Sequence, residues 1–294
     1  MDSPVEVYLE TNITDSGLMF GNSVWRQAGI HSSNFGKLAD YLHTISEEVR
    51  LIWFTPLSSA KVMFLVARYC VLIHIGFSGM YHFRSGLSSE ECTRSFIQVF
   101  ISSSLIVLSA EAILYIRIHA FSGMNRKLMV YLVIQYIIFH AFALAYGVKV
   151  LVSVKFRPAS MPNSPCIPMA VDQSSLGIAY GFSLASIVAI MSIMVYVAHQ
   201  KYRNLKSSLF LLFYREGVLY FLCLSALACS NIIATYLAPL SYKFIMLEPQ
   251  VLVHSLLSTR MLLHLRGWAE RDLTAEMMQP SFCAIELLAI VSRS

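Results

Sequence analysis

The residues of this sequence most able to do chemistry are ionisable ones that lie inside long apolar stretches. Arg68, Glu111 and Arg260 each lie within a run of mainly apolar residues. Charged groups are costly in hydrocarbon, so they usually face the interior of a helix bundle and pair there. At about 1.5 Å per helical residue, Arg68 lies about 12 Å and Glu111 about 9 Å from the same end of their helices, with Arg260 at a similar depth. We therefore expect an intramembrane charge cluster, in which Glu111 pairs with Arg68 or Arg260.

Arg68 and Arg260 have an alternative to pairing with Glu111, because a long basic side chain can extend until its charge lies among the lipid headgroups.

Three histidines, His74, His140 and His254, lie in apolar stretches as well. A lone histidine in such a place is more often a hydrogen-bonded packing residue than a ligand. No His/Glu or Cys/His spacing typical of a metal site is present. We therefore expect no metal and no cofactor.

Two of the cysteines are candidates for a disulfide. Cys92 and Cys166 lie in separate polar stretches that the topology derived next places on one non-cytoplasmic side, where oxidation is allowed. Cys70, Cys223 and Cys229 lie inside apolar stretches, where a thiol behaves as a small hydrophobe. A Cys92–Cys166 disulfide is the favoured pairing, and two free thiols are the alternative.

The composition excludes an ordinary soluble protein. Of the 294 residues, 56% are hydrophobic and only 13% are charged, whereas soluble domains carry about 25% charged residues. Such a chain has too little polar surface to cover a water-soluble globule of this size, so its solvent is the lipid bilayer. The net charge of +5 is modest and no basic run is long enough to indicate nucleic-acid binding.

Six stretches are long and apolar enough to be membrane-spanning helices, which need about 20 residues. Lipid offers no partner for backbone groups, and the stretches do not alternate as barrel strands do, so helices are favoured. The last stretch is the most polar, and small residues such as Gly177 and Gly181 recur where helices would pack closely. The fold class expected is all-α, a polytopic transmembrane helix bundle of about six spans. The stretches are about 60–82, 95–117, 128–151, 175–199, 217–239 and 244–265.

Basic residues divide the connecting segments between two sides. Lys and Arg are more frequent before the first stretch and after the second, fourth and sixth than in the three opposite loops. Because basic loops stay in the cytoplasm, the C-terminus should be cytoplasmic, in the plasma membrane or an endomembrane. The opposite loop 152–174 is rich in proline and should be irregular. The expected divisions are a partly disordered polar segment 1–40, the bundle 41–267 and a cytoplasmic tail 268–294.

A motif near the start of the bundle resembles the N-terminal signature of a family of fungal, mainly basidiomycete, membrane proteins with a domain of unknown function. Further similarity lies at Arg215–Phe221 and at Ser258–Arg266, so the resemblance covers about residues 41–267. It implies a seven-span protein of uncharacterised function. The residues that match the N-terminal signature are Glu48, Arg50, Trp53, Lys61, Arg68 and Tyr69.

The chain departs from that family before Tyr41, where the first span that the resemblance implies is missing. Either the protein has six spans, or its start comes from an altered gene model or splice form. With seven spans the N-terminus would lie outside and Asn12 would be a usable glycosylation acceptor. We favour six spans, which place the N-terminus in the cytoplasm.

We expect an integral membrane protein of uncharacterised function that acts in receptor-like signalling. It would bind an unknown small-molecule ligand and a cytoplasmic signalling partner. The outer disulfide and the basic cytoplasmic loops favour this interpretation. Rhodopsin-type signatures are absent, since the second stretch ends in Tyr115-Ile116-Arg117 instead of an acidic-Arg-Tyr triplet. A small-molecule transporter or channel is the alternative, although no internal repeat supports it. We expect no enzyme, because no nucleophile–base set stands out.

Overall fold

In the part of the chain that the computed structural model describes, five long helices form the body of the protein. Each is long and apolar enough to cross a membrane, so the predicted all-α, polytopic helix bundle is confirmed. They are α2 (Ser59–Phe83), α3 (Ser89–Phe121), α4 (Arg126–Ser153), α5 (Gln173–Tyr202) and α6 (Ser208–Leu237). The structure describes residues 44–55, 58–84, 86–122, 125–156, 166, 168–202, 208–239, 243–244, 246–264 and 266–267.

Several predictions concern residues outside those ranges. The disorder of segment 1–40, the missing first span, the Asn12 sequon and the tail 268–294 all belong to this group. They stay predictions.

Polar side chains fix where the helices begin, because the first turn of a helix leaves backbone N–H groups without partners. The Ser58 hydroxyl accepts from the first turn of α2, and the Asn125 side chain does so for α4. Ser88 and Glu91 form a reciprocal capping box at the start of α3. Asp172 accepts from two backbone N–H groups of α5. These caps lie in the polar stretches between the apolar runs, so the helices extend beyond the runs themselves.

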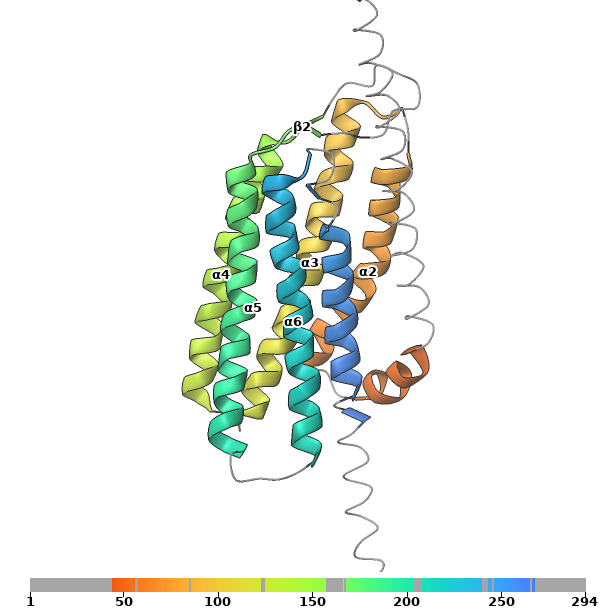
Figure 1. Ribbon diagram of the computed structural model, residues 1–294. Coiled ribbons are helices and arrows are strands. Elements are labelled where there is room, and N and C mark those ends of the chain that lie inside the picture. The colour runs from red at the N-terminus through yellow and green to blue at the C-terminus, as the bar shows by residue number, and fades with distance from the viewer. Residues whose placement is uncertain are drawn as a thin grey trace, which may run out of the picture.

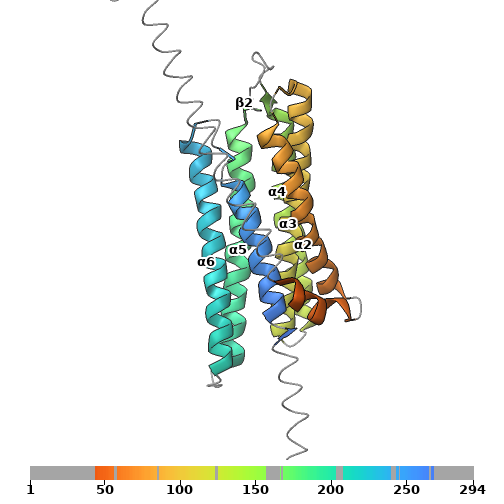
Figure 2. The same cartoon turned by 90° about the vertical axis from the view of Figure 1, so that its right-hand side faces the viewer.

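The helices run up and down, and a further helix lies beside α6 on the side toward α2 (Figure 1). α2 packs on α3, α4 on α5, and α5 on α6. The further helix, residues 247–264, lies between α6 and the α2–α3 pair (Figure 2). It corresponds to the sixth predicted span, but it is not among the five helices that qualify by length and hydropathy.

Burial explains the polar composition of residues 247–264. Val251, His254 and Ser258 are each 0% exposed, because neighbouring helices surround them. A helix enclosed by other helices meets little lipid, so its polar groups need partners in the protein rather than an apolar surface. Pro249 lies in its first turn, where the missing N–H costs nothing. Glu248 and Pro249 therefore lie at the start of this helix.

A short helical segment, residues 44–55, lies across one end of the bundle (Figure 1). Its second half is the π-helix η1 (Val49–Trp53). Leu51 and Ile52 are buried there with Phe64 and Leu263, in an apolar cluster shared by α2 and the last helix. No helix was predicted for this segment.

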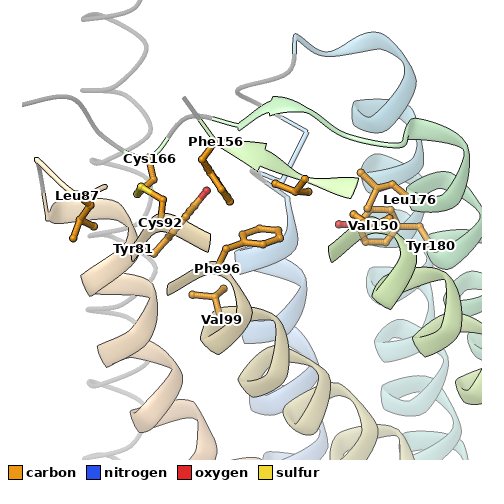
Figure 3. Packing of buried hydrophobic residues seen from close by; sticks show 11 residues of the cluster. Tyr81, Leu87, Cys92, Phe96, Val99, Val150, Phe156, Cys166, Leu176 and Tyr180 are labelled. Atoms are coloured by element: carbon orange, nitrogen blue, oxygen red, sulfur yellow. A yellow bond between two sulfur atoms is a disulfide. The ribbon is translucent and has the colours of Figure 1, made fainter. Parts of the chain in front are cut away.

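The opposite end, called the hairpin end below, is closed by a two-stranded antiparallel ribbon. The strands are β1 (Lys155–Phe156) and β2 (Pro168–Ala170), so the described ends of the proline-rich loop are paired rather than irregular. Beneath them Tyr81, Phe96 and Phe156 contact one another edge to face or at a tilt (Figure 3). This aromatic cluster anchors the ribbon to α2 and α3.

Candidate functional site

A buried carboxylate joins three helices in the middle of the bundle. Glu111 of α3 is 2% exposed. Its Oε2 accepts a hydrogen bond of 2.8 Å from the Ser186 hydroxyl of α5, and it lies 3.2 Å from Nε2 of His140 on α4. In lipid each of these groups would otherwise lack a partner, so the junction stabilises one arrangement of the three helices.

The contact between Glu111 and His140 must contain a proton. His140 Nδ1 lies 2.8 Å from the Tyr136 carbonyl oxygen, which only accepts, so Nδ1 carries the hydrogen of the neutral ring. Nε2 and the carboxylate oxygen would then both be acceptors. One additional proton, on the imidazole or on the carboxyl, is needed for them to bond. The pair therefore holds one exchangeable proton.

Further polar groups direct their hydrogens toward the same carboxylate. Gln135 Nε2 donates to the Tyr115 hydroxyl at 3.3 Å, and that hydroxyl lies 3.3 Å from Ser186 Oγ. Since the Ser186 hydrogen goes to Glu111, Tyr115 must donate to Ser186. The chain of donors runs from α4 through α3 and α5 to Glu111, and such chains reinforce each bond in a low dielectric.

Four buried atoms near this junction have no hydrogen-bond partner among the described residues. They are Gln135 Oε1, the Tyr220 hydroxyl oxygen and both ring nitrogens of His254. Tyr220 and His254 interact electrostatically with the Glu111 carboxylate. Buried polar atoms are nearly always paired, so these four mark a part of the core in which hydrogen bonding between the described residues is incomplete.

A second carboxylate–imidazole pair lies closer to the hairpin end. His74 Nε2 of α2 is 3.1 Å from Glu248 Oε2 of the last helix, and the Ser78 hydroxyl donates to Glu248 Oε1 at 2.9 Å. His74 Nδ1 lies 2.8 Å from Ser102 Oγ, and that oxygen also lies 2.9 Å from the Gln98 carbonyl of its own helix. His74 therefore links the start of helix 247–264 to α2 and α3 through its two ring nitrogens.

The residue types Ser102, His74 and Glu248 are those of a hydrolase triad, in which the serine gives its hydrogen to the imidazole. The Ser102 hydroxyl has two competing acceptors, since its oxygen lies 2.9 Å from the Gln98 carbonyl of its own helix and 2.8 Å from His74 Nδ1. All three side chains are buried, so their contacts hold α2, α3 and helix 247–264 together.

A third cluster, at the end opposite the hairpin, assembles five of the six signature residues, whereas Arg50 is exposed. Glu48 is 0% exposed and accepts from Arg68 Nε, forming a buried ion pair. Its other oxygen accepts from the Tyr69 hydroxyl at 2.8 Å and from the Trp53 indole N–H at 3.2 Å. Lys61 Nζ donates to the Trp53 carbonyl at 2.9 Å. The signature therefore encodes the attachment of residues 44–55 to α2.

The predicted partners of Glu111 were wrong. Arg68 is bound to Glu48, Glu111 to His140 and Ser186, and Arg260 is exposed on the last helix. Depth along a helix gives the level of a side chain but not the direction in which it points. His140 was interpreted as a packing residue, although its position on a neighbouring predicted span could have made it a candidate partner.

The structure joins Cys92 and Cys166, the pair favoured from the sequence, in a disulfide at the hairpin end (Figure 3). Cys70, Cys223 and Cys229 are free thiols. Near this end, hydrogen bonds from Ser175 lower the pKa of Asp172.

Comparison with known proteins bears on one part of the chain. Residues 38–73 match DUF6533, a family of unknown function. The matched stretch contains the Glu48 cluster: Glu48, Trp53, Lys61, Arg68 and Tyr69. No curated protein and no solved structure matches the chain.

Proposed function

We propose that this integral membrane protein is a receptor-like signalling protein whose helix arrangement responds to proton binding in its core. The observation that carries the proposal is the Glu111–His140 contact, which requires one exchangeable proton and joins α3 to α4 at 3.2 Å. Loss of that proton leaves two acceptors facing each other in hydrocarbon. The helices then separate or repack, because a buried polar group without a partner is costly.

The neighbouring unpartnered atoms support a polar ligand at the same place. Gln135 Oε1 accepts, the Tyr220 hydroxyl can donate or accept, and a neutral His254 ring does one of each. A small molecule with both hydroxyl and amine groups could satisfy them. Binding there would add the last helix to the junction, since His254 belongs to that helix.

The outer disulfide and the basic residues support a definite orientation. The sequence bias of Lys and Arg places the C-terminus and residues 44–55 in the cytoplasm and the hairpin end outside. A signalling partner would then meet the end that carries the Glu48 cluster. Epitopes inserted in loop 152–174 should be accessible only from outside sealed cells, whereas a tag after residue 267 should be cytoplasmic. The reverse pattern would contradict the orientation.

A pH titration in a bilayer tests the proposal. The full chain, with Cys70, Cys223, Cys229 and Cys283 replaced by serine, carries a fluorescent label at Arg126→Cys, the first residue of α4, and is reconstituted in nanodiscs. Between pH 5 and pH 8 we expect a sigmoidal change in label emission. Glu111→Gln should remove it, because the amide cannot lose a proton. Glu90→Gln, on the exposed Glu90–Arg94 pair, is the matched control and should leave it unchanged.

A titration that is identical in the parent and in Glu111→Gln contradicts the proposal. The same samples, at one fixed pH, serve for a screen of amino acids, amines and polyols by thermal shift. A compound that stabilises the parent but not the Glu111→Gln variant would identify the ligand class.

A proton-coupled transporter is the second candidate. It is favoured by the presence of two carboxylate–imidazole pairs at different levels of the bundle, with His254 on the same helix as Glu248. Chains of Glu and His are typical of proton relays. Proteoliposomes containing a pH-sensitive dye distinguish the two functions. Proton flux that Glu111→Gln abolishes indicates a transporter, whereas a pH-dependent label signal without flux indicates a receptor.

A further inference from the structure

We propose that residues 44–55 are a membrane-interface helix, whose outward apolar stripe of Ile45, Val49 and Trp53 inserts at the boundary between lipid headgroups and acyl chains. The proposal concerns the end of the bundle rather than its core, and it is independent of the proposed function. Its ligand is the bilayer surface itself.

The segment has two different faces. Thr44, Glu48 and the pair Leu51 and Ile52 point inward and are buried against the bundle. Ile45, Val49 and Trp53 recur every four residues on the outward side and are 37%, 36% and 54% exposed. Residues four apart lie on one helical face, so these three form a continuous apolar stripe.

Phe54 extends the stripe and is 84% exposed. The exposed part of Trp53 is apolar, because its indole N–H already donates to Glu48 at 3.2 Å. Exposed polar residues lie beside the stripe, namely Ser46, Glu47 and Arg50. A helix with an apolar stripe next to a polar one, and with aromatic residues in the apolar part, is typical of helices that lie in the interface plane.

The height of the segment matches the membrane boundary. Lys61 is in the first turn of α2, and its Nζ donates to the carbonyls of Trp53 and Thr55 at 2.9 and 2.7 Å. α2 has 25 residues, a length of about 37 Å, whereas the hydrocarbon layer is about 30 Å thick. The first turn of α2 therefore lies at the edge of the hydrocarbon, and the Trp53 backbone lies at that level with it. Tryptophan is enriched at this depth in membrane proteins.

Contacts on the inward face connect the bilayer surface to two spans. Glu48 is ion-paired with Arg68 of α2. Arg266, two residues beyond His264 and itself helical, donates to the Leu51 carbonyl at 3.1 Å and to the Thr55 hydroxyl at 2.9 Å. The segment is thus held in place by the protein on one side while its other side faces the lipid.

Depth-dependent quenching of Trp53 fluorescence tests the proposal. The full chain carries Trp25→Phe and Trp268→Phe, so that Trp53 alone emits, and is reconstituted in phosphatidylcholine vesicles. We expect lipids brominated near the headgroup end of the acyl chain to quench Trp53 more than lipids brominated near its terminus, and aqueous iodide to quench it weakly. A matched probe, Trp53→Phe with Glu47→Trp, places the indole on the polar stripe and should be quenched mainly by iodide.

Two variants examine the stripe itself. Val49→Asp should at least halve the lipid quenching of Trp53, while Ser46→Asp, on the polar side, should leave it unchanged. Circular dichroism and gel filtration establish that each variant is folded. Equal iodide quenching at Trp53 and at the position 47 probe overturns the proposal. So does quenching of Trp53 that depends on the protein-to-lipid ratio, because that result would identify a second copy of the chain as the occupant.

Discussion

The hydrogen bonds of Glu111 replace the water that lipid cannot supply. A carboxylate in hydrocarbon is tolerated only when donors surround it, and His140 and Ser186 provide them from two other helices. Removing one donor therefore costs more than the bond itself, because a polar group remains buried without its partner. The same reasoning applies to Glu248, which accepts from His74 and Ser78.

His140→Phe should lower the free energy of unfolding by about 3–5 kcal/mol, since it keeps the ring volume but leaves the buried carboxyl without its imidazole. Adding Glu111→Gln to this variant should recover a large part of the loss, because the remaining group no longer carries a charge. Glu90→Gln, at a solvent-exposed ion pair, should change the stability by less than about 0.5 kcal/mol. Thermal unfolding in nanodiscs measures all three, and equal losses in the single and double variants would contradict the pairing.

Protonation of Asp172 should make the protein less stable in acid. Hydrogen bonds from Ser175 lower the pKa of this carboxyl in the folded state below its ordinary value of 3.8. Its contribution to stability is therefore complete above that value and is lost as the pH falls through the lower, folded pKa. The melting temperatures of the parent and of Asp172→Ala should differ by a constant amount at pH 5 to 7 and converge below pH 4. A difference that persists undiminished at pH 3 would exclude this mechanism.

At the scale of the helix, small residues have different roles at neighbouring positions of α5. A Cβ atom at Gly177 would clash with the Tyr236 hydroxyl oxygen of α6, whereas a Cβ at Gly181 would meet nothing within 4 Å. Gly177 therefore makes room for the Tyr236 side chain of α6, whereas Gly181 has no such contact.

Gly177→Ala should destabilise the bundle by about 1–3 kcal/mol, because Tyr236 must turn away or α5 and α6 must separate. Gly181→Ala should be neutral or slightly stabilising, since alanine favours the helix and has room there. Replacing Tyr236 by Ala should remove most of the penalty at Gly177. Thermal unfolding of the variants checks the prediction, and equal effects at the two glycines would refute it.

The spans were predictable because the length of an apolar run is a local property of the sequence. Their ends were not, because caps decide them: α3 was expected at 95–117 and extends over Ser89–Phe121, since Ser88 and Glu91 cap it outside the apolar run. The candidate site was predicted only as the presence of Glu111 in the core. Its partner depends on how α3 and α4 are rotated, which no single span encodes. The signature residues were recognised together, but their common role follows only from the fold of residues 44–55.

At the scale of the whole molecule, one covalent bond connects parts of the chain that are far apart in sequence. The Cys92–Cys166 disulfide closes a loop with a sequence separation of 74 and ties the β1–β2 ribbon to the start of α3. α3 and α4 lie within that loop, so the disulfide limits how far the hairpin end can open.

Cys92→Ser with Cys166→Ser should lower the free energy of unfolding by about 2–4 kcal/mol, the range expected for a disulfide that closes a long loop. Cys70→Ser, at a free and partly buried thiol, is the control and should have a much smaller effect. Unfolding of oxidised and reduced protein, with cysteine alkylation to count free thiols, measures the difference. Equal stability of the two forms would show that the ribbon is held by its aromatic contacts alone.

The polar helix 247–264 has a consequence for how the protein enters the membrane during synthesis. Glu248, Gln250 and His254 would make this segment a poor substrate for the insertion machinery if it were presented alone. It is made after α2, α3 and α6, which are then already in the bilayer and can offer partners such as His74 and Asn231. Its insertion therefore depends on the earlier helices, and a defect in α2 at His74 should first become visible as a C-terminal segment that fails to integrate.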